Sequence, residues 1–323
     1  MGFSADTDRG GGGGLRYNQT MPTRAVNAQD TPLQSLFGSE LHDRLLLSCH
    51  LLGKPTAAQL ARLHADQVRS DPTMRRHLAA LSQSTEPMLA VIKPLLIENT
   101  SRHLPFVYLD TTRSRRRIEK MFGIPFRRPP ELPSRDWRFL YHDVSLVDEL
   151  IAFELTARRH GLPFGYESHF DLDGKRVYPA ITISDGQLQH RLEPRPDKTL
   201  IIGDHHLVIE HDCGEETVSL GHIMRDATIA RKQLVYDQLE RDGALDRLGW
   251  NKRLYLYIID GKKRTQISSR KRIKRCIETF PAPANPHRFY FIDRQAFLEA
   301  GDDVSGLTWL RADGQAGRLP CFR

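Results

Sequence analysis

The chain has 323 residues, of which 39 % are hydrophobic and 27 % are charged, a balance typical of a folded protein of about two domains. Lysine and arginine total 47 against 40 aspartate and glutamate residues, a net charge of +7. A basic surplus favours polyanionic partners such as nucleic acid. No apolar run reaches the roughly 20 residues of a membrane helix, and no apolar stretch of a secretory signal opens the sequence. We therefore expect a cytoplasmic protein with no membrane partner.

The four cysteines are widely separated along the chain, at Cys49, Cys213, Cys276 and Cys321. None belongs to a Cys-x-x-Cys pair, so neither a zinc knuckle nor a disulfide framework is indicated. This pattern agrees with a reducing compartment.

The N-terminal part predicts a tail followed by a small helical domain. Residues 1–37 contain a glycine run without apolar periodicity and are expected to be a disordered tail. Residues 38–112 form the first predicted domain, with helices at 40–52, 57–64 and 71–81 and strands at 88–92 and 103–109. This order predicts a winged helix-turn-helix whose third helix enters the major groove of DNA. Arg75 and Arg76 on that helix favour this interpretation over a plain three-helix bundle, which stays open as the alternative.

A basic, proline-rich linker is predicted over residues 113–136, because four prolines between 125 and 133 disfavour regular structure. Arg115, Arg116 and Arg117 in this segment are candidate phosphate contacts. A solvated run of charge fits them equally well.

The second predicted domain covers residues 137–300 and is followed by a C-terminal tail, 301–323. Helices are predicted at 142–160, 223–241 and 268–280, and strands at 164–170, 198–202, 207–211, 253–259 and 288–292. The closing strand–helix–strand order predicts a parallel crossover. A mixed sheet flanked by helices is the architecture that accommodates these elements.

Three carboxylates follow the pattern of a metal site. Asp197 precedes one predicted strand, and Glu210 and Asp212 end the next one. The tight hairpin between the strands brings these ends together, and residues two apart on a strand share a face. The three carboxylates would repel one another without a cation. We therefore predict that they bind Mg²⁺ or Mn²⁺, which can activate water against a phosphodiester.

Three further residues are candidates for the same site. Glu154 lies on the apolar face of its predicted helix, where an unpaired carboxylate is costly, although a pair with Arg158 one turn away is an equal alternative. Glu167 lies in the first predicted strand. Lys232 on the following helix is positioned to stabilise phosphate charge, and Tyr236 lies one turn further on the same face.

Histidines near the hairpin offer a competing zinc site, since His205, His206, His211 and His222 surround it. His205 and His206 belong to the turn at the opposite end from Glu210, so they do not join one ligand set with the carboxylates. A zinc site is therefore the less favoured alternative.

A basic tract from residue 262 to residue 275 is the last candidate DNA contact. Lys262, Lys263, Arg270 and Lys271 are its candidate phosphate-binding residues. A merely solvated helix face is the alternative.

The acidic pattern resembles that of PD-(D/E)XK nucleases, with Pro196-Asp197 as the first half and Glu210-His211-Asp212 as the second. The departure is Asp212, which stands where those nucleases usually have lysine; Lys232 would be a lysine that has moved to the next helix. Over residues 40–295 the chain also resembles the replication-relaxation family, related to the MOB-C type relaxases of mobilisable plasmids. The matching residues are His142-Asp143, Glu167, Pro196-Asp197, Lys232, Tyr236 and the run from Glu210 to Thr217, in which Glu215-Glu216 is inserted relative to the family signature.

The resemblance implies an α/β protein that joins a winged helix-turn-helix to a restriction-endonuclease-like mixed α/β sheet domain. The expected function is metal-dependent nicking of DNA at a transfer or replication origin of a plasmid or mobile element, with DNA and conjugation machinery as partners. A homodimer reading paired half-sites stays open. The alternative is a DNA-binding accessory or regulatory protein whose nuclease fold has lost catalysis. The presence of Asp212 where lysine is usual supports this alternative.

Overall fold

The computed structural model describes residues 40–92, 105–123, 137–167, 178–184, 189–214, 216–218, 228–261, 266–280 and 282–323. The predicted tail at 1–37, most of the predicted linker and the candidate contacts Lys262 and Lys263 lie outside the described residues. Among the described helices, none combines the length and apolar character that a membrane span requires.

The N-terminal part consists of helices followed by an antiparallel pair of strands. Its elements are α1 (Glu40–Leu52), α2 (Ala57–Leu63), α3 (Asp71–Ser82), β1 (Leu89–Ile92) and β2 (Val107–Asp110). The helix starts follow from capping residues, because Thr56 and Gln59 form a reciprocal capping box and Pro72 occupies the first turn of α3. The three predicted helices are confirmed, and the strands differ from the prediction only at their ends.

The prediction of a linker is wrong for residues 113–122, which belong to α4 (Thr112–Phe122). Thr111 caps this helix through Ser114, and Gly123 ends it at a φ of 66° that only glycine adopts without strain. Ile118 and Phe122 are buried against the other N-terminal helices. The prolines begin after the helix, so they do not oppose it, and the apolar pair four residues apart outweighs the run of arginines.

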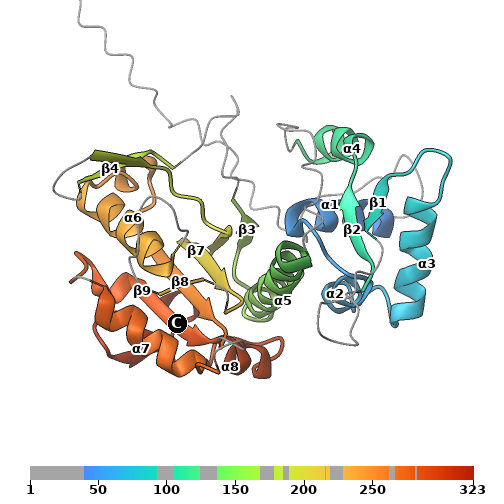
Figure 1. Cartoon of the computed structure of the whole chain (residues 1–323). Coiled ribbons are helices and arrows are strands. Elements are labelled where there is room, and N and C mark those ends of the chain that lie inside the picture. The colour runs from blue at the N-terminus through green and yellow to red at the C-terminus, as the bar shows by residue number, and fades with distance from the viewer. Residues whose placement is uncertain are drawn as a thin grey trace, which may run out of the picture.

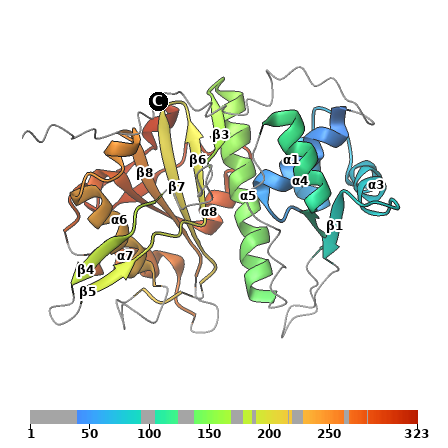
Figure 2. The ribbon, with the colours of Figure 1, turned by 90° about the horizontal axis from the view of Figure 1, so that it is seen from above.

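The central element is α5 (Trp137–Arg159), five residues longer at its start than predicted. Val147, Leu150 and Phe153 have no exposed surface, because the helix lies between the N-terminal helices and the sheet (Figure 2). One apolar cluster runs from α1 through α5 to one face of the sheet. The N-terminal helices and the sheet therefore share a core across α5.

Seven strands form the mixed sheet, in the order β11-β10-β9-β8-β7-β6-β3. The strands are β3 (Phe164–Tyr166), β6 (Lys198–Ile202), β7 (His205–Asp212), β8 (Arg253–Ile259), β9 (Phe289–Asp293), β10 (Trp309–Arg311) and β11 (Ala316–Gly317). The neighbours β7, β8 and β9 are parallel, and the remaining pairs are antiparallel. The predicted mixed sheet with a parallel crossover at its end is confirmed.

Helices cover both faces of this sheet (Figure 1). The connections between the parallel strands contain α6 (Ile229–Arg241) and α7 (Ser269–Thr279), which lie on one face with the hairpin of β4 (Ile181–Ser184) and β5 (Gln189–Leu192). The other face carries α5 and α8 (Arg294–Glu299). Side chains of β8 alternate accordingly: Tyr255 and Tyr257 join the cluster under α6 and α7, whereas Leu254 and Leu256 join the cluster under α5. Short 3₁₀ turns occur at Asp246–Leu248, Pro286–Arg288 and Pro320–Phe322.

The segment predicted as a C-terminal tail, 301–323, is instead part of the fold. It contributes β10 and β11 to the edge of the sheet. Trp309 has no exposed surface and packs edge-on against Phe297 of α8 at 6.2 Å between ring centroids. The prediction failed because these strands are two or three residues long, too short for an alternating pattern to emerge.

We expect Trp309→Ala to lower the free energy of unfolding by about 3–5 kcal/mol, because it removes a fully buried indole and leaves a cavity. Urea denaturation followed by circular dichroism measures the change. The matched control is Arg318→Ala, an exposed residue of the same segment, with an expected change within about 0.5 kcal/mol. Equal stability of Trp309→Ala and the parent chain would show that the segment does not belong to the core.

Candidate active site

The ends of β6 and β7 meet as the hairpin predicts. Lys198 pairs with Ile209 across the two strands, so Asp197 lies beside the end of β7. Its Oδ2 atom accepts a hydrogen bond of 2.7 Å from the backbone N–H of His211. This contact fixes one carboxylate at the edge where Glu210 is also found.

Lys232 joins the carboxylates of this edge. Its Nζ atom lies 2.7 Å from Glu210 Oε2, 2.9 Å from Glu216 Oε1 and 3.8 Å from Asp197 Oδ2. Thr228 caps the start of α6, which places Lys232 in the first turn of that helix. The predicted convergence of Asp197, Glu210 and Lys232 is confirmed, and Glu216 is an addition to it.

Tyr236 lies one turn beyond Lys232 and points to the same carboxylate. Its hydroxyl donates a hydrogen bond to Glu210 Oε1. Tyr236 is almost fully buried, so its part is to hold the Glu210 carboxyl in place.

Asp212 does not belong to this group. It shares a strand face with Glu210, as expected, but its Oδ2 atom lies 2.5 Å from Arg272 of α7, and its Oδ1 atom accepts from the backbone N–H groups of Gly214 and Glu216. The prediction that Asp197, Glu210 and Asp212 share one metal ion is therefore wrong for Asp212. The sequence treated Arg272 only as one member of a basic tract, although it is buried.

The described residues contain no group of three or more histidine, cysteine or acidic side chains arranged to bind a metal. Asp197 and Glu210 nevertheless fit a magnesium or manganese ion, because Mg²⁺ is often held by one or two carboxylates, with waters and substrate phosphates completing the shell. One oxygen of Glu210, Oε2, is buried without a hydrogen-bond partner among these residues, its contact with Lys232 being an ion pair without hydrogen-bond geometry. The ammonium group of Lys232 stands beside this oxygen, so a metal ion would bind there only with a shift of that side chain.

The remaining predicted carboxylates lie apart from the lysine. Glu154 forms the ion pair with Arg158 that was the alternative, and it accepts a hydrogen bond of 2.8 Å from Tyr166. Glu167 lies 3.4 Å from His206 Nδ1, and burial raises its pKa. Neither has a contact with Asp197, Glu210 or Lys232 that would make it a ligand of the same ion, so the site predicted from the sequence was too large.

His142 of α5 approaches Asp197, and this contact was not predicted from the sequence. Its Nε2 atom donates to the carbonyl oxygen of His211 at 3.0 Å and lies 3.5 Å from Asp197 Oδ2. On its other side it meets Asp143, which pairs with Lys54 of the N-terminal part. The sequence signal was the position of His142-Asp143 at the start of the helix, quoted for the family resemblance but not connected to Asp197.

The two carboxyls of the site differ in their electrostatic environment. Burial would raise the pKa of Asp197, but Lys232 and His142 outweigh it and hold that pKa well below its usual range. Burial raises the pKa of Glu210 to about 8, which Lys232 offsets only in part. Hydrogen bonds to Asp143 and Asp197 overcome the burial of His142 and raise its pKa to about 10. The environment thus pushes the pKa values of Asp197 and Glu210 in opposite directions, a divergence of the kind found at catalytic centres.

The histidines do not gather into a zinc site. His211 turns to the opposite face of the sheet, where its Nδ1 atom lies 2.6 Å from Glu149 Oε1 and both residues are fully buried. His205 and His206 pair with Asp204 and Glu167. His222 lies outside the described residues.

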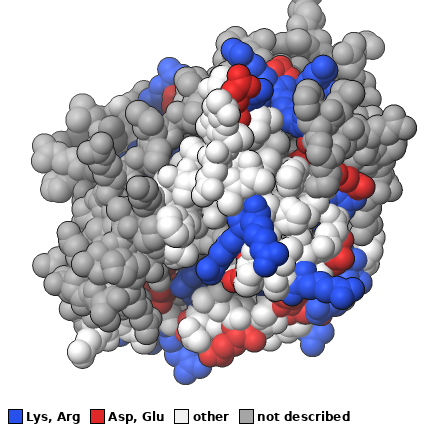
Figure 3. All heavy atoms as spheres, turned by 90° about the vertical axis from the view of Figure 1, so that its right-hand side faces the viewer, with Lys and Arg blue, Asp and Glu red and all other residues white. Residues whose placement is uncertain are grey.

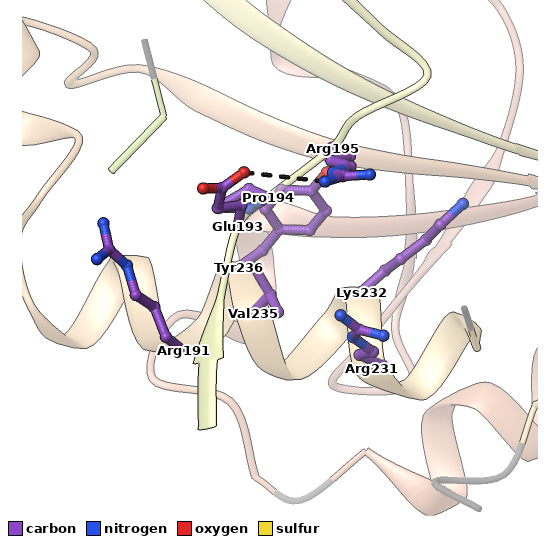
Figure 4. Close-up of a pocket in the computed structure, with 8 residues that line it drawn as sticks. All are labelled: Arg191, Glu193, Pro194, Arg195, Arg231, Lys232, Val235 and Tyr236. Atoms are coloured by element: carbon purple, nitrogen blue, oxygen red, sulfur yellow. Dashed lines mark ion pairs between the residues drawn. The ribbon is translucent and has the colours of Figure 1, made fainter. Parts of the chain in front are cut away.

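A cavity of about 470 Å³ opens beside Lys232 and Tyr236 (Figure 4). Two arginines, Arg191 and Arg195, reach it from β5 and the segment that follows, and Arg231 reaches it from the first turn of α6. The lining residues are Arg191, Glu193, Pro194, Arg195, Arg231, Lys232, Val235 and Tyr236. This excess of cations suits an anionic substrate, and the volume suits one nucleotide or a little more. Arg191 was not predicted because it belongs to the short β4–β5 hairpin, which carries no clear pattern, and the approach of Arg195 and Arg231 to the same cavity depends on packing that the sequence does not reveal.

The predicted DNA contacts of the N-terminal part are only partly available. Arg75 and Arg76 are exposed on α3, and Arg116 is exposed on α4, whereas Arg115 and Arg117 are tied to Asp110 and Asp43. Figure 3 shows basic side chains over this end of the molecule in separate groups rather than in one continuous patch. On α7, Arg270 and Lys271 are exposed.

Comparison of the chain with models of known families, with characterised proteins and with solved structures found no match.

We expect Glu210→Gln to stabilise the fold at alkaline pH. The folded-state pKa of Glu210, about 8, lies above its ordinary value, so its contribution to stability is present at low pH and is lost as the pH rises through 8. The variant should therefore unfold with a free energy roughly 1–3 kcal/mol higher than the parent at pH 9, and with little difference at pH 5. Urea denaturation at both pH values measures this.

Glu154→Gln is the matched control, since it also replaces a buried glutamate but one that an arginine and a tyrosine satisfy. It should destabilise the fold by about 1–3 kcal/mol. If Glu210→Gln were destabilising to the same degree at every pH, the account of the site as a set of unbalanced carboxyls would be wrong.

Proposed function

We propose that this chain is a metal-dependent DNA endonuclease of the nicking, relaxase-like kind. One observation carries the proposal: a half-buried lysine on α6 contacts two carboxylates at the ends of neighbouring strands, beside a cavity lined by arginines. Asp197, Glu210 and Lys232 supply the side-chain types that phosphodiester hydrolysis requires, namely oxygen ligands and a cation for developing negative charge.

The arrangement of elements supports the same class. Three helices followed by an antiparallel pair of strands agree with a winged helix-turn-helix, in which α3 would be the recognition helix. A mixed sheet with the acidic edge at a β6–β7 hairpin and the lysine on the next helix agrees with a restriction-endonuclease-like domain. The resemblance to the replication-relaxation family adds a substrate, an origin of transfer or replication on a plasmid or mobile element.

The proposed reaction gives each residue of the site a role. Arg191, Arg195 and Arg231 bind backbone phosphates of the strand in the cavity. Lys232 stabilises the negative charge that develops on the phosphate under attack, and His142 keeps Asp197 ionised and oriented. Asp197 and Glu210 would hold the Mg²⁺ or Mn²⁺ ion, which when bound supplies an activated water and polarises the phosphate.

The partners follow from the class of reaction. The N-terminal part and the exposed Arg270 and Lys271 of α7 would contact duplex DNA around the nick, and conjugation machinery would receive the nicked strand. A homodimer is compatible with paired half-sites.

A second function, DNA binding without catalysis, has one observation in its favour. The position that carries lysine in the nuclease pattern holds Asp212, which pairs with Arg272 rather than with Lys232. In this alternative the chain would be an accessory or regulatory factor, and Lys232 would only neutralise buried carboxylates.

Nicking of supercoiled DNA decides between the two. With DNA that carries the region around the encoding gene, and with Mg²⁺ or Mn²⁺, we expect open circles to form. Asp197→Asn and Lys232→Met should each slow this step by roughly 100-fold or more, because each removes a group that touches the reacting phosphate or its ion. Gel electrophoresis under single-turnover conditions measures the rate.

Glu154→Gln serves as the control and should nick at the parent rate, since Glu154 lies outside the site. Nicking that persists in Asp197→Asn and Lys232→Met would disprove the assignment of the site. DNA binding without nicking under either metal would favour the accessory function.

The recognition helix makes a separate prediction. Arg75→Ala with Arg76→Ala should weaken binding to all DNA sequences and make the dependence of log K on log salt shallower by up to about 2, since each lost phosphate contact removes about 0.9 of slope. Fluorescence anisotropy between 50 and 200 mM salt measures this. An unchanged slope would show that α3 does not face DNA.

A further inference from the structure

A second cavity lies in the N-terminal part of the molecule and shares no lining residue with the one beside Lys232. It encloses about 520 Å³ between α1, the end of α3, the turn before β1, and α4. Leu46, Leu81 and Met88 give it an apolar wall. Its volume falls in the range of small-molecule sites, roughly 300–1,000 Å³, which combine apolar walls with a few placed polar groups.

The charges around this cavity do not cancel. Four basic side chains of α4 line it, Arg113, Arg116, Arg117 and Lys120, against two acidic ones, Asp43 and Glu86. Burial and the neighbouring His77 lower the pKa of the remaining titratable residue, His42, so it adds no charge at neutral pH. The surplus of two positive charges matches a phosphate monoester, which carries about −1.5 to −2 near pH 7.

Two of the four cations are available to a ligand. Arg113 pairs with Glu86, and Arg117 pairs with Asp43 at 2.5 Å. Within the part of the chain that the structure describes, Arg116 and Lys120 have no ion-pair partner. They lie four residues apart on α4, hence on one helix face, and both are exposed at the rim.

Asp43 lines the cavity and has an acceptor that is not used within the described residues. The residue is 1 % exposed, and its Oδ1 atom accepts a hydrogen bond of 2.7 Å from Arg117. Its Oδ2 atom is buried and has no hydrogen-bond partner among the described residues. A buried acceptor without a partner is unfavourable, and a hydrogen bond from a ligand N–H group would relieve this.

We propose that this cavity binds a purine nucleoside monophosphate. The N–H groups of the base donate to Asp43 Oδ2, the apolar wall covers the base, and the phosphate contacts Arg116 and Lys120. The same chemistry is offered by a free nucleotide and by a nucleotide within a DNA strand. This inference does not depend on catalysis at Asp197 and Glu210.

Isothermal titration calorimetry of the full chain with AMP and GMP tests the site, with adenosine and guanosine as the matching ligands that lack phosphate. We expect saturable binding of at least one monophosphate and at least tenfold weaker binding of its nucleoside. Arg116→Ala with Lys120→Ala should weaken monophosphate binding at least tenfold. The matched control is Arg318→Ala with Arg323→Ala, an exposed pair of the same charge outside both proposed sites, which should bind as the parent does.

A short single-stranded oligonucleotide distinguishes the two sources of the ligand. If it competes with the monophosphate and its own binding depends on Arg116 and Lys120, the site takes a nucleotide of a strand; if it does not compete, the site takes a free nucleotide. The absence of saturable binding by both monophosphates would overturn the proposal. So would an equal loss in the two double variants, or a loss confined to duplex DNA binding, which would assign Arg116 and Lys120 to a DNA surface.

Discussion

A single half-buried ammonium group, that of Lys232, holds together the carboxylates at one edge of the sheet. Three carboxylates, those of Asp197, Glu210 and Glu216, lie within 4 Å of it, and they come from the start of β6, the end of β7 and the segment beyond. Burying charges costs several kcal/mol for each ion, and one cation cannot neutralise three anions. His142, whose Nε2 atom lies 3.5 Å from Asp197 Oδ2, reduces the imbalance. This arrangement contributes little to the stability of the fold, and we therefore attribute it to the function of the site.

The helix α5 connects this edge to the rest of the molecule. His142 on α5 reaches Asp197, whereas the next residue, Asp143, pairs with Lys54 of the N-terminal part. Gln59 of α2 donates to the carbonyl oxygen of Val144 at 2.8 Å, so the start of α5 is held from both sides. Because these contacts follow one another along the start of α5, a displacement of the N-terminal helices relative to α5 would change the position of His142 beside Asp197. If the proposed function holds, DNA binding and catalysis would be coupled through these packed side chains and ion pairs.

The sequence was sufficient for the long elements and for the hairpin geometry. Strong apolar periodicity located α1, α5 and β8, and the spacing from Asp197 to Glu210 placed two carboxylates at one edge. Short elements were missed because two or three residues carry no pattern: β10 and β11 turned the expected tail into a sheet edge. The helix α4 was not predicted because its sequence is dominated by arginines. Its buried face shows only two apolar residues, Ile118 and Phe122, which is too few for a clear helical pattern.

At the site, sequence spacing predicted proximity but not pairing. Glu210 and Asp212 do share a strand face, yet one faces a lysine of α6 and the other an arginine of α7. That choice depends on which helix covers which end of the strand, and this is decided by packing. His142 was missed for a similar reason: it comes from a helix on the other face of the sheet and reaches Asp197 past the end of β7.

The position of a bound metal ion would decide whether Asp197 and Glu210 form the metal site. Crystals of the chain grown with Mn²⁺ and a short DNA strand would reveal the ion through its anomalous scattering. We predict one strong peak between the carboxylates of Asp197 and Glu210, with Asp212 still paired to Arg272. A peak elsewhere, or none while Lys232 remains between the two carboxylates and DNA lies in the cavity, would contradict the account.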